Sequence, residues 1–214
     1  MERGRFITLE GGEGAGKSTQ ARRLSERLEA AGIEALVTRE PGGSVGAEAV
    51  RELLVSGAVD RWDPLSEAML HFVARRDHML RLILPALRQG TWVISDRFTD
   101  STIAYQGYGQ GTDREYLDAL KAIAIGTFAP DLTLLLDLPA EDGLARAASR
   151  DDGGSRYERM EVAMHERLRD GFLALAKAEP ERIAVIDASA DEDTVAEQVW
   201  AVTLAHTGIG EANG

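Results

Sequence analysis

Residues 6–18 read FITLEGGEGAGKS and decide the fold, because an apolar run of strand length leads directly into a G-x-x-x-x-G-K-S pattern. Residues 17–31, which follow, have the 3.6-residue apolar periodicity of a helix. Glycines in such a loop let backbone N–H groups turn inward around a phosphate, and the start of the helix adds positive potential. The order of strand, loop and helix therefore predicts a phosphate-binding loop in a nucleotide-binding protein.

The loop pattern also assigns roles to its side chains. Lys17 is expected to reach the β- and γ-phosphates of ATP, and Ser18 to hold a Mg²⁺ ion. The residues predicted to contact ATP in this stretch are Gly11, Gly12, Glu13, Gly14, Ala15, Gly16, Lys17, Ser18 and Thr19. Kinases, motors, switches and assembly ATPases all carry such a loop, so it does not define the reaction.

Composition narrows the class of protein. The chain has 214 residues, no cysteine, and 36 acidic against 24 basic residues, for a net charge of -12. These values are typical of one globular domain and exclude a disulfide framework or a thiolate metal site. The negative charge disfavours nucleic acid as a partner. With no leader peptide and no apolar run of bilayer length, we expect a cytoplasmic protein without a membrane partner.

Strand-length apolar runs alternate with helical periodicity along the chain. The runs lack polar alternation, which indicates strands covered on both faces. We expect strands at 6–9, 35–38, 92–94, 132–138 and 183–186, and helices at 17–31, 45–57, 64–89, 113–125, 140–149, 157–178 and 191–206. Pro85 should interrupt the third helix. The predicted fold class is an α/β P-loop three-layer sandwich, a five-stranded parallel sheet with helices on both faces.

Charged side chains follow two of the predicted strands. Residues 39–43 read REPGG after the second strand, and residues 95–98 read SDRF after the third. Ligands of such sheets bind at the carboxyl ends of the strands. Asp96 is placed to hold Mg²⁺ or its water, and Arg97 to grip a second phosphate, although a purely structural Arg–Asp pair is the alternative.

Two further groups could read a base and a sugar. Phe72 and Arg76 are four residues apart on the predicted long helix and share a face, so one could stack on a base while the other bonds to its edge. The alternative is a core phenylalanine and a solvated arginine. Residues 100–107, DSTIAYQG, carry hydroxyls and an amide just beyond Arg97.

Together, the loop at 10–18, the REPGG segment, Asp96-Arg97 with Ser101-Thr102, and Tyr105-Gln106-Gly107 resemble the bacterial thymidylate kinases, over about residues 5 to 190. The resemblance implies transfer of the ATP γ-phosphoryl group to dTMP, giving dTDP and ADP in dTTP biosynthesis, with Mg²⁺ and in a homodimer. It implies catalytic roles for Lys17, Asp96 and Arg97, and Mg²⁺ ligation by Ser18 and Asp96. It implies dTMP contacts by Glu13, Arg39, Pro41, Phe72, Arg76, Arg97, Ser101, Thr102, Tyr105 and Gln106.

The resemblance also implies a lid. The loop positions 12–15 hold no arginine, and family members of that kind supply the positive charge from a lid, here at about 146–159 within a single domain spanning 1–207 and followed by a frayed tail at 208–214. Arg146, Arg150 and Arg156 are the predicted ATP contacts there, with Arg150 as the catalytic one and Arg159 as a further candidate. An arginine over the transferring group raises the rate by roughly 10³ to 10⁵.

Two other classes remain open from the residues. One is a P-loop kinase with a different base preference. The other is a nucleotide-dependent switch, against which the chain shows no Asn-Lys-x-Asp motif and carries arginines on the acceptor side that a switch would not need.

Overall fold

The computed structural model describes residues 3–149 and 156–209, and its centre is a sheet of five parallel strands. The strands are β1 (Phe6–Glu10), β2 (Ala35–Arg39), β3 (Trp92–Asp96), β4 (Leu132–Asp137) and β5 (Ile183–Asp187). Their order across the sheet is β2-β3-β1-β4-β5. Ile7 of β1 lies in register with Ile94 on one side and Leu132 on the other. This confirms the expected five-stranded parallel sheet.

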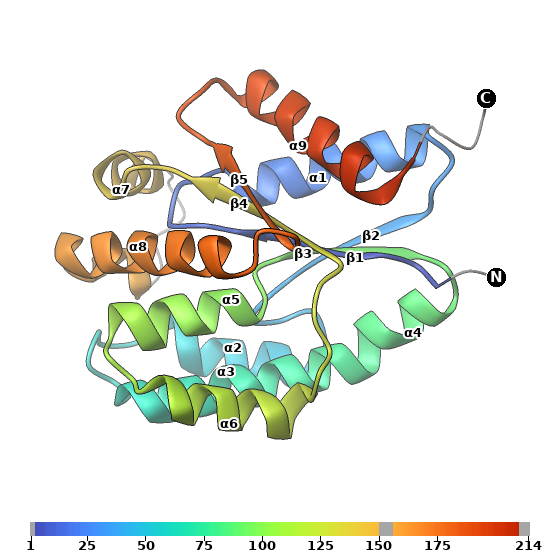
Figure 1. Ribbon diagram of the computed structural model, residues 1–214. Helices are drawn as coiled ribbons and strands as arrows, with labels where there is room; N and C mark the ends of the chain where they lie inside the picture. Colours follow the sequence, from blue (N-terminus) through green and yellow to red (C-terminus); the bar gives the residue numbers. More distant parts are fainter. Residues whose placement is uncertain (1–2, 150–155, 210–214) are drawn as a thin grey trace.

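Helices cover both faces of the sheet, which gives three layers (Figure 1). Helices α1 and α9 lie on one face, and α3, α5 and α8 lie on the other. The bounds are α1 Lys17–Ala30, α2 Val45–Val55, α3 Pro64–His78, α4 Leu84–Arg88, α5 Thr99–Thr102, α6 Arg114–Ile125, α7 Ala140–Ala148, α8 Val162–Ala178 and α9 Glu192–Thr207.

Alternate strand residues enter two separate apolar layers. On β1, Ile7 and Leu9 pack with the helices α1 and α9. Phe6 faces the other layer, where its ring meets the edge of Phe98 at 5.0 Å between centroids. Because both layers are apolar, the strands read as continuous apolar runs in the sequence.

The long helix expected at 64–89 is divided. It runs as α3 to His78, passes through a π-helical turn at Met79–Ile83 and continues as α4. Pro85 has no N–H for the preceding turn, and the neighbouring Leu84 N–H bonds to the Met79 carbonyl, five residues back. The expected interruption at Pro85 therefore takes the form of a widened turn.

The segment after β3 was not expected to be helical. It coils as α5 and then as a π-helical turn at Ile103–Gly109. Its hydroxyl and amide side chains are buried, and they face back toward the carboxyl ends of the strands: Ser101, Thr102, Tyr105 and Gln106.

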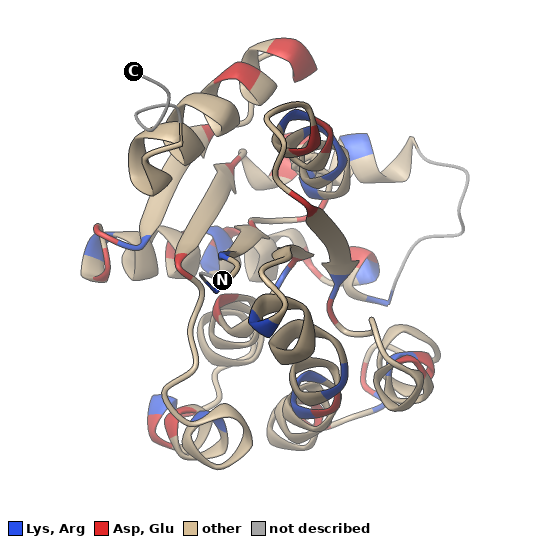
Figure 2. Cartoon of the chain, turned by 90° about the vertical axis from the view of Figure 1, so that its right-hand side faces the viewer, with Lys and Arg blue, Asp and Glu red and all other residues tan. Residues whose placement is uncertain are grey.

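The surface charges are mixed. Figure 2 shows Lys and Arg interspersed with Asp and Glu on the outer helices. Several of these are paired, for example Arg22 with Glu26 and Arg27 with Glu197. Within the described ranges, none of the helices has the length and apolarity needed to cross a bilayer.

Candidate functional site

The phosphate-binding loop joins the end of β1 to the start of α1, as expected. Gly16 precedes Lys17 with a φ of 86°, and Gly14 has a φ of 68°. A Cβ at Gly14 would lie 2.0 Å from the carbonyl oxygen of Gly143 on α7. Glycine is therefore required at position 14, both by its backbone conformation and by the close approach of α7.

The loop borders a cavity of about 240 Å³, here called the loop pocket. Its lining residues are Glu13, Gly14, Gly16, Lys17, Ser18, Thr19, Asp96, Arg97 and Arg146. The other predicted loop residues stand behind it. Gly12 accepts a hydrogen bond from Lys17 Nζ at 2.6 Å, Ala15 is buried in the core, and Gly11 packs against the Leu136 carbonyl. Burial and the charge of Arg97 lower the pKa of Lys17 to about 8.

Two oxygen-bearing side chains meet in the loop pocket. Ser18 Oγ donates to Asp96 Oδ2 at 2.5 Å, which joins the first turn of α1 to the end of β3. The described residues hold no cluster of three or more His, Cys, Asp or Glu side chains that could bind a metal ion. A hydroxyl beside one carboxylate nevertheless suits Mg²⁺, which keeps several waters and takes its other ligands from phosphates.

Arg97 lies where the loop pocket meets a second cavity. Its φ of 74° is in the left-handed region, at a cost of about 1–2 kcal/mol for a non-glycine residue. Its guanidinium donates to the carbonyl of Gly11 at 3.0 Å, to Ser101 Oγ at 3.1 Å and to Glu13 Oε1 at 3.1 Å. Burial alone would lower the pKa of Arg97, but the groups facing it, Tyr105 and Glu13 first among them, raise it above the usual range. A charged group is thus held in a strained, fixed position.

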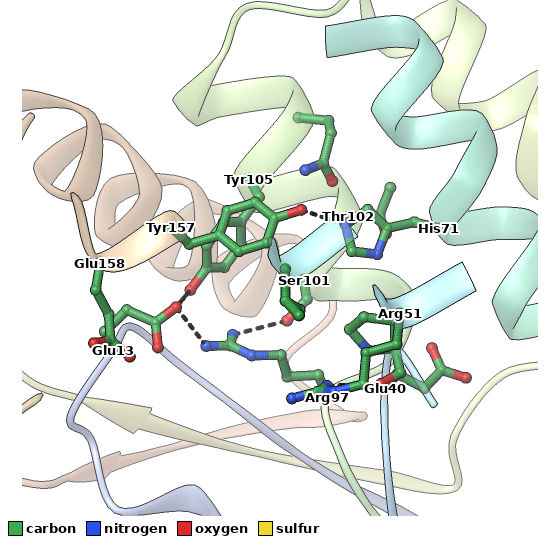
Figure 3. A pocket seen from close by; sticks show the side chains of 13 residues that line it. Glu13, Glu40, Arg51, His71, Arg97, Ser101, Thr102, Tyr105, Tyr157 and Glu158 are labelled. Atoms are coloured by element: carbon green, nitrogen blue, oxygen red, sulfur yellow. Dashed lines mark hydrogen bonds and ion pairs between the residues drawn. The ribbon is translucent and has the colours of Figure 1, made fainter. Parts of the chain in front are cut away.

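The second cavity, here called the side cavity, has a volume of about 370 Å³ (Figure 3). It includes seven of the predicted dTMP contacts, and Figure 3 shows several of their side chains converging on it. Its lining residues are Glu13, Glu40, Pro41, Arg51, Val55, His71, Arg97, Ser101, Thr102, Tyr105, Gln106, Tyr157 and Glu158.

Glu13 and Tyr105 form one wall of the side cavity. The Tyr105 hydroxyl donates to Glu13 Oε1 at 2.7 Å, and the Arg97 guanidinium lies 4.9 Å from the centre of the Tyr105 ring. Burial alone would raise the pKa of Glu13, but Arg97 and Lys17 outweigh it and hold that pKa at about 2. Glu13 is therefore a carboxylate at neutral pH, able to accept a hydrogen bond from a ligand hydroxyl.

The structure does not bring Phe72 and Arg76 to the side cavity. Phe72 is buried in the apolar layer that contains Phe6 and Phe98. Arg76 Nη1 donates to the carbonyl of Ala124 on α6 at 2.7 Å. The physical reason is the phase of α3, because apolar packing turns Phe72 into the core and leaves the adjacent face of the helix toward the cavity.

Of the two residues one position earlier, His71 lines the side cavity, and Arg75 is buried behind its wall. The Nε2 of His71 lies 2.9 Å from the Tyr157 hydroxyl. Arg75 is 2% exposed and donates to Glu40 at 2.7 Å and to Thr102 at 3.0 Å. Burial, and then the charge of Arg75, lower the pKa of His71 to about 3, so its imidazole is neutral.

The sequence pattern of α3 could have indicated which face of the helix points toward the side cavity. Polar residues recur on α3 at spacings of four, four and three residues, and all of them point inward in the structure: Glu67, His71, Arg75 and His78. A polar stripe with helical periodicity on an otherwise apolar helix indicates a functional or ion-paired face.

Arg39 and Arg51 differ in whether they line the side cavity. Arg39 pairs with Glu48 at 3.1 Å and is not among the residues that line the side cavity. Arg51, which the sequence did not single out, lines that cavity and donates to the Pro41 carbonyl at 2.7 Å. Burial, followed by the charge of Arg39, lowers the pKa of Arg51.

The predicted lid arginines have different positions. Arg146 lines the loop pocket and donates to the Ala188 carbonyl at 3.0 Å. Arg156 is fully buried away from that pocket, bonded to the Val59 carbonyl at 2.6 Å and paired with Glu67. Arg159 donates to the Gly57 carbonyl at 2.9 Å. Arg150 lies outside the described residues.

Comparisons with known proteins identify the family of the chain. A family model described as thymidylate kinase matches residues 9–199. A thymidylate kinase of Caulobacter vibrioides is 54% identical over 98% of this chain and 100% of its own length, and one of Nitrobacter winogradskyi is 52% identical over 94% and 88%. The crystal structure of thymidylate kinase from Ehrlichia chaffeensis has a TM-score of 0.77 and 36% identity, over 94% of this chain and 99% of that one.

A phosphate-binding loop, a separate cavity and a shared arginine between them would fit several kinase families. The match across nearly the whole length selects one of them, and the chain belongs to the thymidylate kinase family.

Proposed function

We propose that this protein transfers the γ-phosphoryl group of ATP to dTMP, giving dTDP and ADP in the synthesis of dTTP. The observation that carries the proposal is that Arg97 and Glu13 line both the loop pocket and the side cavity. ATP in the first and dTMP in the second would direct their phosphates toward the same guanidinium. This is the in-line arrangement that phosphoryl transfer requires.

The chemistry needs positioning and positive charge rather than a base. The acceptor is a phosphate monoester whose second pKa is about 6, so its oxygen is already ionised at neutral pH. Repulsion between the two nucleotides is the main obstacle. Lys17, Arg97 and Arg51 supply positive charge around the meeting point, in a protein whose overall charge is -12. Arg146 adds a further cation on the ATP side.

Ser18 and Asp96 are the proposed ligands of Mg²⁺. Their oxygens lie together in the loop pocket, on the side where the ATP phosphates would enter. When bound, Mg²⁺ neutralises phosphate charge and orients the tail of ATP.

Base and sugar recognition follows from the walls of the side cavity. Glu13 would accept from the 3′-hydroxyl, and the Tyr105 ring would crowd a 2′-hydroxyl. At the base end the proposal replaces the pair first expected on α3 by His71 and Arg75, because His71 lines the cavity and Arg75 holds Thr102, which also lines it. Pro41, Ser101 and Gln106 complete the wall.

We also propose a cytoplasmic homodimer. Helices α2 and α3 expose apolar side chains that the sheet does not use: Leu53, Met69 and Val73. A second copy packing through these helices would bury them. Sedimentation that shows only monomer at micromolar concentration contradicts the dimer.

A panel of acceptors tests the activity. Labelled ATP and Mg²⁺ are incubated with dTMP, dUMP, dCMP, dGMP and dAMP in parallel, and we expect dTMP to be phosphorylated fastest. The Lys17→Ala variant serves as the control for contaminating kinases. Preference for another base, or ATP hydrolysis without transfer to any acceptor, would overturn the proposal.

A further inference from the structure

Glu10 is a buried carboxylate that has no role in the transfer described above. It is the last residue of β1, is fully buried, and directly precedes the phosphate-binding loop. Its Oε1 accepts the Phe98 N–H at 2.8 Å, and its Oε2 accepts the Ser101 hydroxyl at 2.5 Å. Both oxygens are thus engaged by the segment that follows β3.

These two contacts enclose Arg97. The Arg97 N–H bonds to the Leu9 carbonyl at 2.9 Å, and the next N–H, that of Phe98, is taken by the Glu10 side chain instead of by backbone. Glu10 therefore holds the chain just after the residue with the left-handed φ. Because β3 has ended before Phe98, no strand partner among the described residues accepts the Phe98 N–H, and the buried Glu10 carboxylate supplies the acceptor instead.

A second path leads from Glu10 to the guanidinium itself. Ser101 donates its only hydroxyl hydrogen to Glu10, which leaves its oxygen free to accept from Arg97 Nη1 at 3.1 Å. The carboxylate thereby fixes the direction in which the hydroxyl points. An amide in its place has one acceptor oxygen where the carboxylate has two, so it cannot receive both donors in the same way.

The buried surroundings of Glu10 oppose its charged form. Burial and the nearby Asp100 raise the pKa of Glu10 to about 7, while the contacts with Ser101, Arg97 and Phe98 oppose that rise. A carboxylate retained at such cost is better explained by a requirement at Arg97 than by its net contribution to stability.

We infer that Glu10 is a positioning residue for phosphoryl transfer: through the Phe98 N–H and the Ser101 hydroxyl it sets the Arg97 guanidinium at the junction of the loop pocket and the side cavity. The inference rests on the proposed function. It connects the end of β1 with Arg97, which lines both pockets. The end of β1 would then position both the phosphate-binding loop that follows it and the arginine that binds the acceptor phosphate.

A double-mutant cycle on Glu10→Gln and Ser101→Ala tests it, with single-turnover transfer to dTMP, the KM for ATP and thermal unfolding as readouts. We expect each single variant to lower the transfer rate by about 10- to 100-fold, because a small displacement of a catalytic group has effects of that size. The KM for ATP should change by less than about twofold. The double variant should be no slower than the slower single variant by more than about twofold, because Glu10→Gln already disturbs the contact through which the Ser101 hydroxyl acts.

Asp131→Asn is the matched control. Asp131 also accepts a β1 N–H, that of Phe6 at 2.7 Å, and pairs with Arg3, but it lies at the opposite end of the strand. Its transfer rate should stay within about twofold of the parent. Lower melting temperature with an unchanged rate for Glu10→Gln, or losses that multiply in the double variant, would overturn the inference.

The experiment distinguishes a failure of the proposed function from a failure of the inference about Glu10. If the parent protein phosphorylates another nucleotide faster than dTMP, the proposed function fails, and the same cycle is read with that acceptor. If Glu10→Gln does not fold, Ser101→Ala decides alone, and full transfer activity in that variant contradicts the inference.

Discussion

The loop pocket and the side cavity share Arg97 but differ in how they are formed: one mainly by a single loop, the other by side chains from several helices. The loop pocket comes largely from the single stretch 13–19, which belongs to a loop of the kind that binds phosphate through backbone N–H groups. The side cavity is assembled from side chains on α2, α3, α5 and the segments around residues 105 and 157. Backbone recognition tolerates most side-chain changes, whereas a side-chain network does not. The exception at the loop pocket is a charged side chain such as Lys17, whose loss should lower turnover, whereas substitutions at the side cavity should change the binding and selectivity of the acceptor.

The largest effect is expected at the loop pocket. Lys17→Ala removes the lysine cation of the loop pocket and should lower kcat by about 10²- to 10³-fold, while the Kd for dTMP stays within about threefold. Transfer kinetics and calorimetric binding of dTMP measure the two quantities. Lys177→Ala, on the exposed end of α8, removes the same charge elsewhere and should leave both unchanged. Comparable losses in kcat and in dTMP affinity would erase the distinction between the two pockets.

The next prediction concerns two adjacent arginines on α3. Arg75→Met removes the buried contacts with Glu40 and Thr102 and should raise the KM for dTMP by about 10- to 100-fold, since a hydrogen bond to a charged group contributes about 1.5–3 kcal/mol. Arg76→Met removes a bond to the α6 backbone and should change that KM by less than about twofold. The reverse ranking would restore the pairing first predicted from the sequence.

These arginines show what the sequence could and could not determine. The loop pocket was predictable because its residues are consecutive and their order specifies a strand, a turn and a helix. On α3 the four-residue spacing fits the pairs 72/76 and 71/75 equally, and only the recurring polar residues from Glu67 to His78 indicate which face turns inward. The phase is set by the packing of Phe72 against Phe6 and Phe98, which are distant in sequence.

Long-range contacts were beyond the sequence for the same reason. Arg156 reads as one of several charged residues in a polar segment, and only the folded chain places it against Glu67, 89 positions away. The helical turns at 99–109 were not predicted because their buried side chains mix hydroxyls and an amide with apolar residues such as Ile103 and Ala104, so the sequence shows no apolar stripe.

A smaller effect is expected for sugar selectivity. Tyr105→Ala removes the ring that would crowd a 2′-hydroxyl and should narrow the preference for dTMP over its ribose counterpart by about 10-fold. Tyr105→Phe keeps the ring and loses only the 2.7 Å bond to Glu13, so it should keep most of the preference. The ratio of kcat/KM for the two acceptors is the measurement. Equal discrimination in all three proteins would remove Tyr105 from sugar recognition.

The smallest effect is a pH dependence of stability. The pKa of His71 is about 3 in the folded protein against an ordinary value of 6.5, so between these values the unfolded chain binds more protons than the folded one. Stability therefore falls as the pH is lowered from about 7 toward 3. His71→Gln cannot take up this proton and can still form a hydrogen bond with the Tyr157 hydroxyl. It should lose less stability than the parent between about pH 7.5 and pH 5.

Urea unfolding midpoints of both proteins at the two pH values measure this difference. Glu10 acts in the opposite direction, because its pKa is raised to about 7 and its folded form holds a proton that the unfolded chain has lost above about 4.5. That contribution is present in both proteins and cancels in the comparison. An identical shift of the midpoints in the two proteins would mean that His71 takes up no proton on unfolding. The base end of the side cavity would then contain an imidazole that titrates normally, in contrast to the neutral wall inferred from its burial beside Arg75.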